Sequence, residues 1–176
     1  MEKRVLFAGF GGQGALFAGR VLANMGMLHG LNVSWMPSYG AEMRGGTTNC
    51  GVILSDNEIG SPTVPIMDAL EAMNLPSLIK FEKMVAPGGI IVYDSSIINK
   101  PHERNDIAYH PIPATQLAFD NGIAGLGNLI MMGKMLALIE LLPRDLIPAA
   151  MSRSIPARRK DMYDANLKAL DAGFAL

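Results

Sequence analysis

The sequence predicts a single three-layer α/β domain in which a mainly parallel, Rossmann-like sheet is flanked by helices. Strand-like and helix-like runs alternate along the chain, which is typical of parallel sheets joined by crossover helices. The first strand-like run ends in a glycine turn that opens a long apolar helix. The 176 residues are 49% hydrophobic and 18% charged, which is enough to bury one core, and we expect one domain over 1–176.

The strand-like runs are apolar and are bounded by glycine, proline or polar residues. They fall at 4–10, 32–36, 48–55, 69–74, 90–93 and 107–112. The run at 69–74 also fits a helical turn, but Pro76 favours a strand followed by a helix over 76–84. The other helices are predicted at 13–29, 113–120, 126–142, 145–151 and 157–172. In the last of these, Tyr163, Leu167, Leu170 and Phe174 recur at helical spacing and predict the face that docks on the core.

Composition excludes several classes of protein. The net charge of −1 lacks the basic excess of a nucleic-acid binder. No uninterrupted apolar stretch is long enough to span a membrane, and the start of the chain does not resemble a signal peptide, so we expect a cytoplasmic protein. The single cysteine, Cys50, cannot ligate a zinc or iron–sulfur site alone, and the three histidines show no metal-ligand spacing. Cys50 lies in an apolar strand and is predicted to be an inert, buried thiol.

Thirteen methionines leave two interpretations open. Methionine fills irregular gaps in cores, and it is also frequent at binding surfaces. The chain therefore has either a methionine-rich core or methionine-rich faces that it buries against other subunits. The second interpretation predicts a homodimer when the chain is isolated.

The first glycine turn, Gly9-Phe-Gly-Gly-Gln-Gly14, has the spacing of a dinucleotide-binding turn. Such a site also needs an acidic residue about 20 positions further on, to bind a ribose hydroxyl. No aspartate or glutamate occurs between Glu2 and Glu42, and the strand at 32–36 does not end in an arginine that could serve NADP. A nicotinamide site is therefore disfavoured. The glycines either present backbone N–H groups to an anion or only permit a tight turn.

A second loop, from Ser38 to Asn49, is more specific than the first. It brings Tyr39, Glu42 and Arg44 into a glycine-rich segment at the end of the second strand. Because ligands bind at the carboxyl ends of strands in open α/β sheets, both loops are predicted to face one edge. Arg44 either binds a phosphate or carboxylate or pairs with Glu42 to hold the loop.

Together the two loops resemble the gamma subunit of 2-oxoacid:ferredoxin (acceptor) oxidoreductases, of the pyruvate, 2-ketoisovalerate or 2-oxoglutarate type. The similarity rests on Gly9–Gly14 and on the motif Pro37-Ser-Tyr-Gly-Ala-Glu-Met-Arg-Gly-Gly-Thr-Thr-Asn-Cys50. The segments at 52–62, 72–78, 87–89 and 125–128 fit the same pattern. The resemblance covers most of the chain and is strongest over residues 5–90.

The resemblance implies a heteromeric enzyme that oxidatively decarboxylates a 2-oxoacid with CoA to acyl-CoA and CO2 and reduces ferredoxin. In that family, thiamine diphosphate and Mg2+ lie between alpha and beta subunits, and [4Fe-4S] clusters lie on beta and on a delta subunit where one exists. The gamma chain alone then binds no cofactor and meets ferredoxin only through the complex. The second loop favours a 2-oxoglutarate or branched-chain substrate.

No catalytic or metal-binding constellation is found in the sequence. We therefore expect this chain to complete the complex, with its loop edge facing the active-site approach and the path of CoA. The candidate contacts to an anion or a partner subunit are Gly9, Gly11, Gly12, Gln13, Gly14, Tyr39, Arg44 and Asn49. A stand-alone nucleotide- or flavin-binding oxidoreductase is the alternative, and a purely architectural partner is another.

Overall fold

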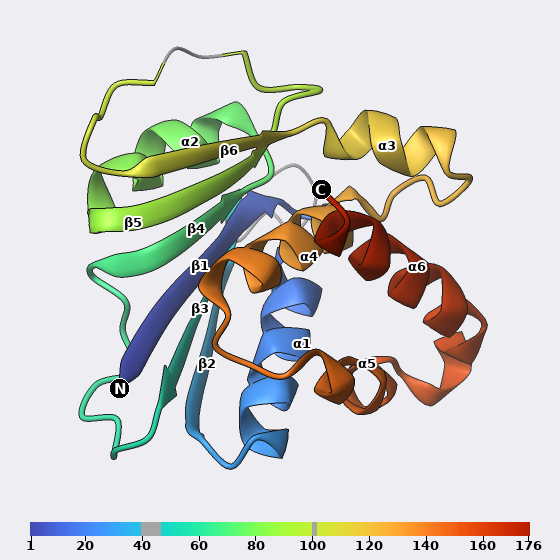
Figure 1. Cartoon of the computed structure of the whole chain (residues 1–176), viewed down its shortest axis with the longest axis horizontal. Helices are drawn as coiled ribbons and strands as arrows, with labels where there is room; N and C mark the ends of the chain where they lie inside the picture. The colour runs from blue at the N-terminus through green and yellow to red at the C-terminus, as the bar shows by residue number, and fades with distance from the viewer. Residues whose placement is uncertain (40–46, 100–101) are drawn as a thin grey trace.

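The computed structural model describes residues 1–39, 47–99 and 102–176, whose path is drawn in Figure 1. Its six strands form one sheet in the order β2-β3-β1-β4-β5-β6. The strands are β1 (Glu2–Phe10), β2 (Asn32–Tyr39), β3 (Thr47–Ser55), β4 (Met67–Ala72), β5 (Val85–Asp94) and β6 (Ala108–Ile112). The α-helices are α1 (Ala15–Leu28), α2 (Leu75–Phe81), α3 (Ala114–Asp120), α4 (Gly127–Ile139), α5 (Ile147–Ser154) and α6 (Tyr163–Phe174). Short 3-10 turns precede β5, α5 and α6 at Glu82–Met84 (η1), Arg144–Leu146 (η2) and Ala157–Met162 (η3).

The sheet is mainly parallel, as predicted. Strands β1, β4, β5 and β6 run in the same direction, and only β3 is antiparallel to its neighbours β1 and β2. Since β3 lies between β1 and β2, those two strands also point the same way. Phe10 pairs with Thr47 and Tyr39 pairs with Thr48, so β1 and β2 end at one edge. The prediction that both loops begin at the same edge is confirmed.

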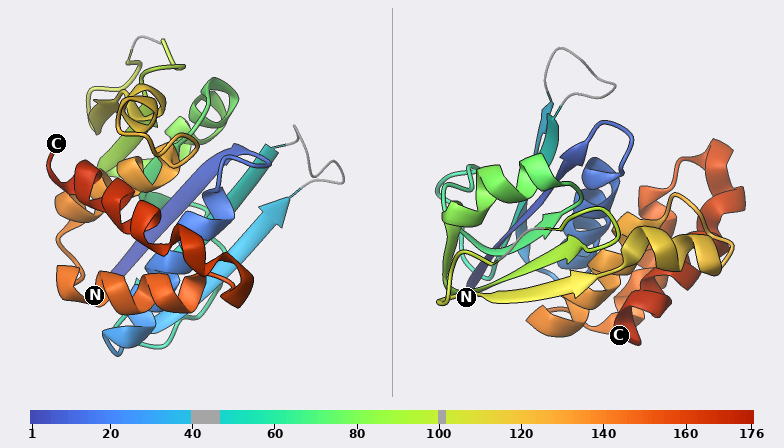
Figure 2. Two further views of the ribbon diagram at one scale, coloured as in Figure 1. Left: turned by 90° about the vertical axis from the view of Figure 1, so that its right-hand side faces the viewer. Right: turned by 90° about the horizontal axis from the view of Figure 1, so that it is seen from above.

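Helices cover both faces of the sheet and make three layers (Figure 2). Helices α1, α4, α5 and α6 lie on one face, and α2 lies on the other. The central strand β1 is buried on both faces because its side chains alternate. Val5 and Phe7 belong to the larger apolar cluster, whereas Leu6 and Ala8 belong to the smaller one under α2.

Helix α4 is buried beneath α6, which crosses it at a pair of glycines. A Cβ atom added at Gly133 would lie 2.2 Å from the carbonyl oxygen of Leu170, and one at Gly173 would lie 1.9 Å from that of Ile130. The buried stripe of α6 is therefore Asn166, Ala169, Leu170 and Gly173. The predicted docking face is confirmed: Leu170 is buried in the core, and Tyr163, Leu167 and Phe174 are half-buried and pack against it.

The element bounds differ from the predicted ones where local backbone geometry intervenes. The ambiguous run at 69–74 is strand β4, and Asn74 caps the following helix by accepting a hydrogen bond from the Ser77 N–H at 2.9 Å. Helix α4 ends at Ile139 rather than 142, because Glu140 adopts a left-handed conformation with φ of 44°. The helix predicted over 157–172 begins only at Tyr163, after the 3-10 turn η3.

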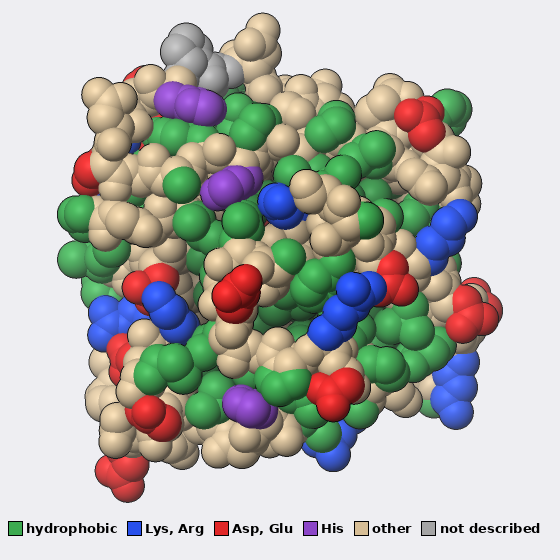
Figure 3. All heavy atoms as spheres, in the orientation of Figure 1, with side chains coloured by type: hydrophobic (Ala, Val, Ile, Leu, Met, Phe, Trp, Pro, Cys, Tyr) green, Lys and Arg blue, Asp and Glu red, His purple; other side chains and the backbone are tan. Residues whose placement is uncertain are grey.

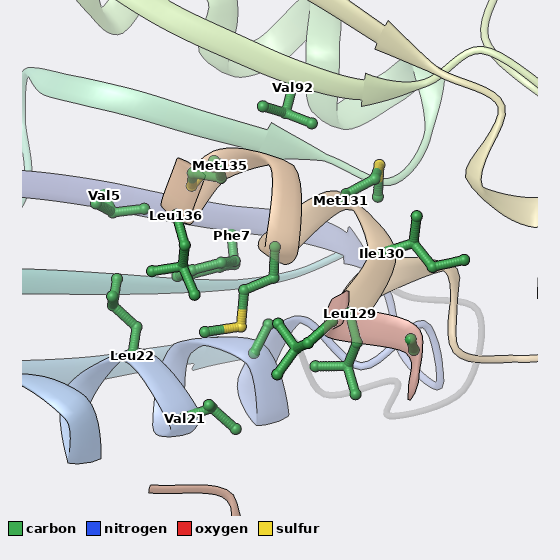
Figure 4. Packing of buried hydrophobic residues seen from close by; sticks show 14 of the residues in the cluster. Val5, Phe7, Val21, Leu22, Val92, Leu129, Ile130, Met131, Met135 and Leu136 are labelled. Atoms are coloured by element: carbon green, nitrogen blue, oxygen red, sulfur yellow. The ribbon is translucent and has the colours of Figure 1, made fainter. Parts of the chain in front are cut away.

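Methionines fill the core between the sheet and the helices. Met131 and Met135 of α4 pack towards Val92 and Phe7 in Figure 4. Met25, Met73, Met132 and Met151 belong to the same cluster. The interpretation of a methionine-rich core is confirmed, while burial against other subunits stays a prediction. Cys50 is also fully buried, and burial raises the pKa of its thiol to about 12, so the predicted inert thiol is confirmed.

One acidic residue is enclosed in this core. Glu71 of β4 is fully buried, and neither of its carboxyl oxygens has a hydrogen-bond partner among the described residues. Its neighbours across the sheet are Phe7 and Val92, both in the larger apolar cluster. Burial disfavours the charged carboxylate and raises the pKa of Glu71 well above its ordinary value.

This burial predicts a pH-dependent stability. The folded state keeps the Glu71 proton above pH 4.5, its ordinary pKa, where the unfolded chain has lost it, so stability falls as pH rises. The slope contributed by this group approaches about 1.4 kcal/mol per pH unit in that window. We expect Glu71→Gln, which has no proton to lose, to flatten the dependence in urea unfolding between pH 5 and pH 8.

The exposed Glu58 provides the matched control, Glu58→Gln. That variant should follow the parent protein at every pH. A Glu71→Gln protein whose stability still falls as steeply as the parent's would show that Glu71 does not carry the effect.

Candidate functional site

The site is built on the turn between β1 and α1. Gly12 and Gly14 adopt positive φ angles of 101° and 88°, which glycine accepts at little cost. Gly14 is the N-cap of α1, and no side chain caps the helix. The first N–H groups of an α-helix have no partner within the helix, and together with the helix dipole they attract an anion.

The side chain of Gln13 ties this turn to the next strand. Its Oε1 accepts hydrogen bonds from the Phe10 N–H at 2.7 Å and from Asn74 Nδ2 at 2.9 Å. Its Nε2 donates to the carbonyl oxygen of Met73 at 2.9 Å. The Gln13 amide thus joins the β1–α1 turn to the β4–α2 turn. The Gln13 amide is occupied by these contacts within the protein, so a ligand at this turn would bind the backbone rather than the Gln13 side chain.

The start of α4 closes against the same turn. Asn128 Nδ2 donates to the carbonyl oxygen of Gly14 at 3.3 Å. A Cβ atom at Gly14 would lie only 2.4 Å from that nitrogen, so the contact requires glycine there. The N-termini of α1 and α4 are consequently neighbours.

An open cleft of about 650 Å³ lies beside the turn, and we call it the α1 cleft. It is lined by Phe10, Gly11, Gly12, Gly14, Ala15, Leu16, Phe17, Arg20, Trp35, Pro37 and Thr48. The guanidinium of the exposed Arg20 lies 5.5 Å from the centre of the Trp35 ring. The cleft therefore combines an apolar wall, the backbone of the glycine turn and the guanidinium of Arg20.

The structure brings some of the predicted residues together and separates others. Gly11, Gly12 and Gly14 line the α1 cleft, and Tyr39 ends β2 at the same edge. Gly9 and Gln13 lie behind the cleft, where a Cβ at Gly9 would be 2.9 Å from Gln13 Oε1. Asn49 lies on the opposite face, in a hollow of about 210 Å³. Arg44 falls outside the described residues.

Sequence reasoning missed Arg20 and Trp35. A helix over 13–29 places Arg20 less than two turns after the glycine turn, which was an available signal. Nothing in the sequence indicated that Trp35 of β2 would pack beneath it, since that contact depends on α1 lying over β2 and β3.

A single cysteine cannot build a four-thiolate iron–sulfur cluster on this chain. The only thiol, Cys50, is buried in the core. Within residues 1–39, 47–99 and 102–176, no three His, Cys, Asp or Glu side chains gather at one point. Within the same ranges, no helix is long and apolar enough to cross a membrane.

The fold is a mainly parallel α/β domain with a glycine turn after its first strand. The family model for pyruvate ferredoxin/flavodoxin oxidoreductase matches residues 4–176. The chain therefore belongs to this family, and the predicted resemblance is confirmed at that level.

Two relatives show how the match is distributed. The chain is 40% identical over 173 residues to ketoisovalerate oxidoreductase subunit VorA of Methanothermobacter thermautotrophicus, covering 98% of this chain and 36% of that protein. It is 32% identical over 180 residues to 2-oxoglutarate synthase subunit KorC of Methanothermobacter marburgensis, covering 98% of this chain and 95% of that one. The chain thus spans about a third of the first relative and nearly all of the second.

Solved structures share the fold. The gamma subunit of a keto/oxoacid ferredoxin oxidoreductase from Geobacter sulfurreducens superimposes with a TM-score of 0.83 at 25% identity, covering 98% of this chain and 96% of that chain. The 2-oxoglutarate:ferredoxin oxidoreductase of Magnetococcus marinus, solved with 2-oxoglutarate, coenzyme A and succinyl-CoA, gives 0.87 at 23% identity over 99% of this chain and 30% of that chain.

The contact at Gly14 predicts a difference between two glycine substitutions. Gly12→Ala places a side chain in open space and pays only for its positive φ, about 1–2 kcal/mol. Gly14→Ala has the same backbone cost and also collides with Asn128, which adds about 1–3 kcal/mol. Urea unfolding of the two variants measures the difference. Equal losses of stability would contradict the proposed contact.

Proposed function

We propose that the chain is the gamma-type subunit of a complex that oxidatively decarboxylates a 2-oxoacid with CoA to acyl-CoA and CO2 and reduces ferredoxin. The family match over residues 4–176 carries this proposal. The similarity to a KorC subunit, which the chain covers to 95% of its length, supports the gamma-type role.

The same proposal assigns the cofactors to other subunits. Alpha and beta subunits, with a delta subunit where the complex has one, would hold thiamine diphosphate, Mg2+ and the [4Fe-4S] clusters. The lone buried thiol of Cys50 supports this division, since a four-thiolate cluster cannot be built on this chain. Ferredoxin would reach the complex in the cytoplasm through those subunits.

The α1 cleft is the proposed contribution of this chain to CoA binding. The α1 N-terminus and the Arg20 guanidinium supply donors and positive charge for the diphosphate. Phe17, Trp35 and Pro37 supply apolar surface for the rest of the cofactor-like substrate. A volume of about 650 Å³ is within the usual range for small-molecule sites. Arg44 remains a proposed second cation from the neighbouring loop.

For the 2-oxoacid, we propose a branched-chain substrate such as 2-ketoisovalerate. The support is the 40% identity to a ketoisovalerate oxidoreductase subunit, against 32% to a 2-oxoglutarate synthase subunit. In this proposal the α1 cleft faces CoA, so the residues of this chain would not select the 2-oxoacid.

The first test is purification of the tagged chain from its native cells. We expect co-purifying subunits and CoA-dependent viologen reduction, fastest with 2-ketoisovalerate among a panel including pyruvate and 2-oxoglutarate. A chain that purifies alone with a bound nucleotide or flavin would instead support a stand-alone Rossmann-like oxidoreductase.

Within that complex, Arg20→Ala should raise the KM for CoA about tenfold or more, because a charge-assisted contact to phosphate is lost. The KM for the 2-oxoacid should change little. Arg153→Ala, an exposed arginine of α5 that does not line the cleft, is the matched control.

The corresponding substitution in the second loop is Arg44→Ala. An assembled complex with unchanged CoA kinetics in both Arg20→Ala and Arg44→Ala would remove the CoA role and leave a purely architectural subunit.

A further inference from the structure

Strand β2 forms one edge of the sheet. It comes first in the strand order, and its hydrogen-bonded neighbour among the described strands is β3. The left view of Figure 2 shows β2 along the outer margin of the sheet. The outer side of an edge strand presents backbone N–H and C=O groups that can pair with a further strand. Neither the family match nor the proposed CoA contact assigns a role to this edge.

The registers of the sheet show which residues of β2 face outward. The Asp56 N–H donates to the Met1 carbonyl oxygen at 3.1 Å, which marks a hydrogen-bonded pair in the antiparallel β1–β3 ladder. Such pairs alternate along a ladder, so even-numbered residues of β3 bond to β1 and odd-numbered ones bond to β2. The latter lie opposite the even-numbered residues of β2, from Asn32 to Ser38. The odd-numbered residues of β2 therefore point their N–H and C=O groups away from the sheet.

Val33, Trp35 and Pro37 carry these outward groups in the middle of the strand. Proline is tolerated in an edge strand where its nitrogen faces outward, so the position of Pro37 agrees with this register. The outward N–H groups of Val33 and Trp35 form no hydrogen bond with any described residue. Just before the strand, the Leu31 N–H is already bonded to the Gly26 carbonyl oxygen at 3.0 Å.

The edge strand carries no charged side chain. Natural edge strands are commonly protected from pairing by charged side chains, especially lysine. No aspartate, glutamate, lysine or arginine occurs between Arg20 and Glu42. In contrast, Figure 3 shows both charges spread among hydrophobic side chains over the face drawn there. Because like charges on directly opposed strands repel, an uncharged strand is the kind that can pair with a second copy of itself.

Two methionines expose apolar surface beside this edge. Met36 of β2 is 40% exposed, and Met27 of α1 is 52% exposed. Met27 lies two turns after Arg20 on the same side of α1, and the Arg20 guanidinium lies over Trp35 of β2. Exposed methionine is typical of binding surfaces. The free backbone groups of the edge thus have apolar side chains next to them.

We propose that two copies of this chain pair through their β2 strands, antiparallel and related by a twofold axis at Ser34. In this register Val33 and the partner's Trp35 exchange both backbone hydrogen bonds, and the axis repeats the pair. Pro37 lies opposite the partner's Leu31. Pro37 has no N–H to donate, and the Leu31 N–H is engaged within its own chain, so neither leaves a donor unpaired. The proposal does not depend on the CoA role of the α1 cleft.

The same pairing brings the two α1 helices to packing distance. Helix α1 contacts both β2 and β3, so its axis lies about half a strand spacing inside β2, and strands are about 4.8 Å apart. The two axes are then about 10 Å apart, as in packed helices. Added Cβ atoms would meet Trp35 from Gly19 and Val33 from Gly26, so the helices meet level with Ala23, midway between these glycines. Helix contact adds the buried area that a strand pair alone lacks for a stable dimer.

The test is light scattering and cysteine cross-linking of the purified full chain. We expect a mass of twice 18.9 kDa. Ser34→Cys places two thiols in a non-hydrogen-bonded pair with Cα atoms about 4.5 Å apart, which a disulfide can bridge. Mild oxidation should therefore give a covalent dimer. Ser38→Cys is the matched control, because its two thiols would lie about 26 Å apart along the strands. The native Cys50 is buried and should not contribute.

A second pair of variants tests the same axis without oxidation. Ser34→Lys places like charges directly opposite each other and should raise the dimer dissociation constant at least about tenfold in sedimentation equilibrium. Ser38→Lys, far from the axis, should dimerise as the parent does. Melting temperatures report whether both variants fold.

A monomeric mass for the parent chain at all protein concentrations would overturn the proposal. So would a dimer in which Ser34→Cys and Ser38→Cys cross-link equally, since its interface would lie elsewhere. In the purified complex, a Ser34→Cys disulfide to a different subunit would also overturn it and assign the edge to a strand of that subunit. Unchanged CoA kinetics in Arg20→Ala would remove the CoA role and leave the β2 pairing intact.

Discussion

The contact between Asn128 and the backbone of Gly14 is the constraint on which the functional edge depends. It holds the N-termini of α1 and α4 together, and only a residue without a Cβ allows the distance. The spaces of the site then meet at one residue. Gly12 lines the α1 cleft and two further hollows, of about 420 Å³ and about 190 Å³. A Cβ atom at Gly14 would displace the Asn128 side chain and change the walls of these spaces.

In the glycine turn, the Gln13 side chain stabilises the structure and the backbone is available to a ligand. The Gln13 amide holds the turn against β4 through contacts to Phe10, Met73 and Asn74. No side chain caps the start of α1, whose first residues line the α1 cleft. A rigid turn with free donors binds an anion at lower entropic cost than a mobile one, because the donors are already positioned. The same geometry therefore serves stability and recognition.

Glu71 and Asn166 are buried side chains with polar atoms that have no hydrogen-bond partner among the described residues. Glu71 lies between Phe7 and Val92 in the sheet, and its burial without a hydrogen-bond partner raises its pKa. Asn166 is also buried, in the stripe of α6 that packs against α4. The buried Glu71 carboxyl destabilises the folded state, and the pH dependence of stability measures this effect. The lack of a partner at Asn166 is the desolvation cost of a neutral amide, which does not depend on pH.

By itself, the sequence determined the local units: the β1–turn–α1 layout, the strand at 69–74 and the family. These depend on short-range patterns, namely glycine spacing, the position of Pro76 and apolar runs, which act before any tertiary contact forms. Only the tertiary structure decided that β3 is antiparallel between β1 and β2, that Asn49 faces away from the α1 cleft, and that Arg20 lies over Trp35. It also placed Asn166 in the buried stripe of α6, through the glycine contact with α4. The strand order and the rotation of α6 depend on packing between segments that are distant in the chain. Local sequence patterns do not encode those long-range contacts.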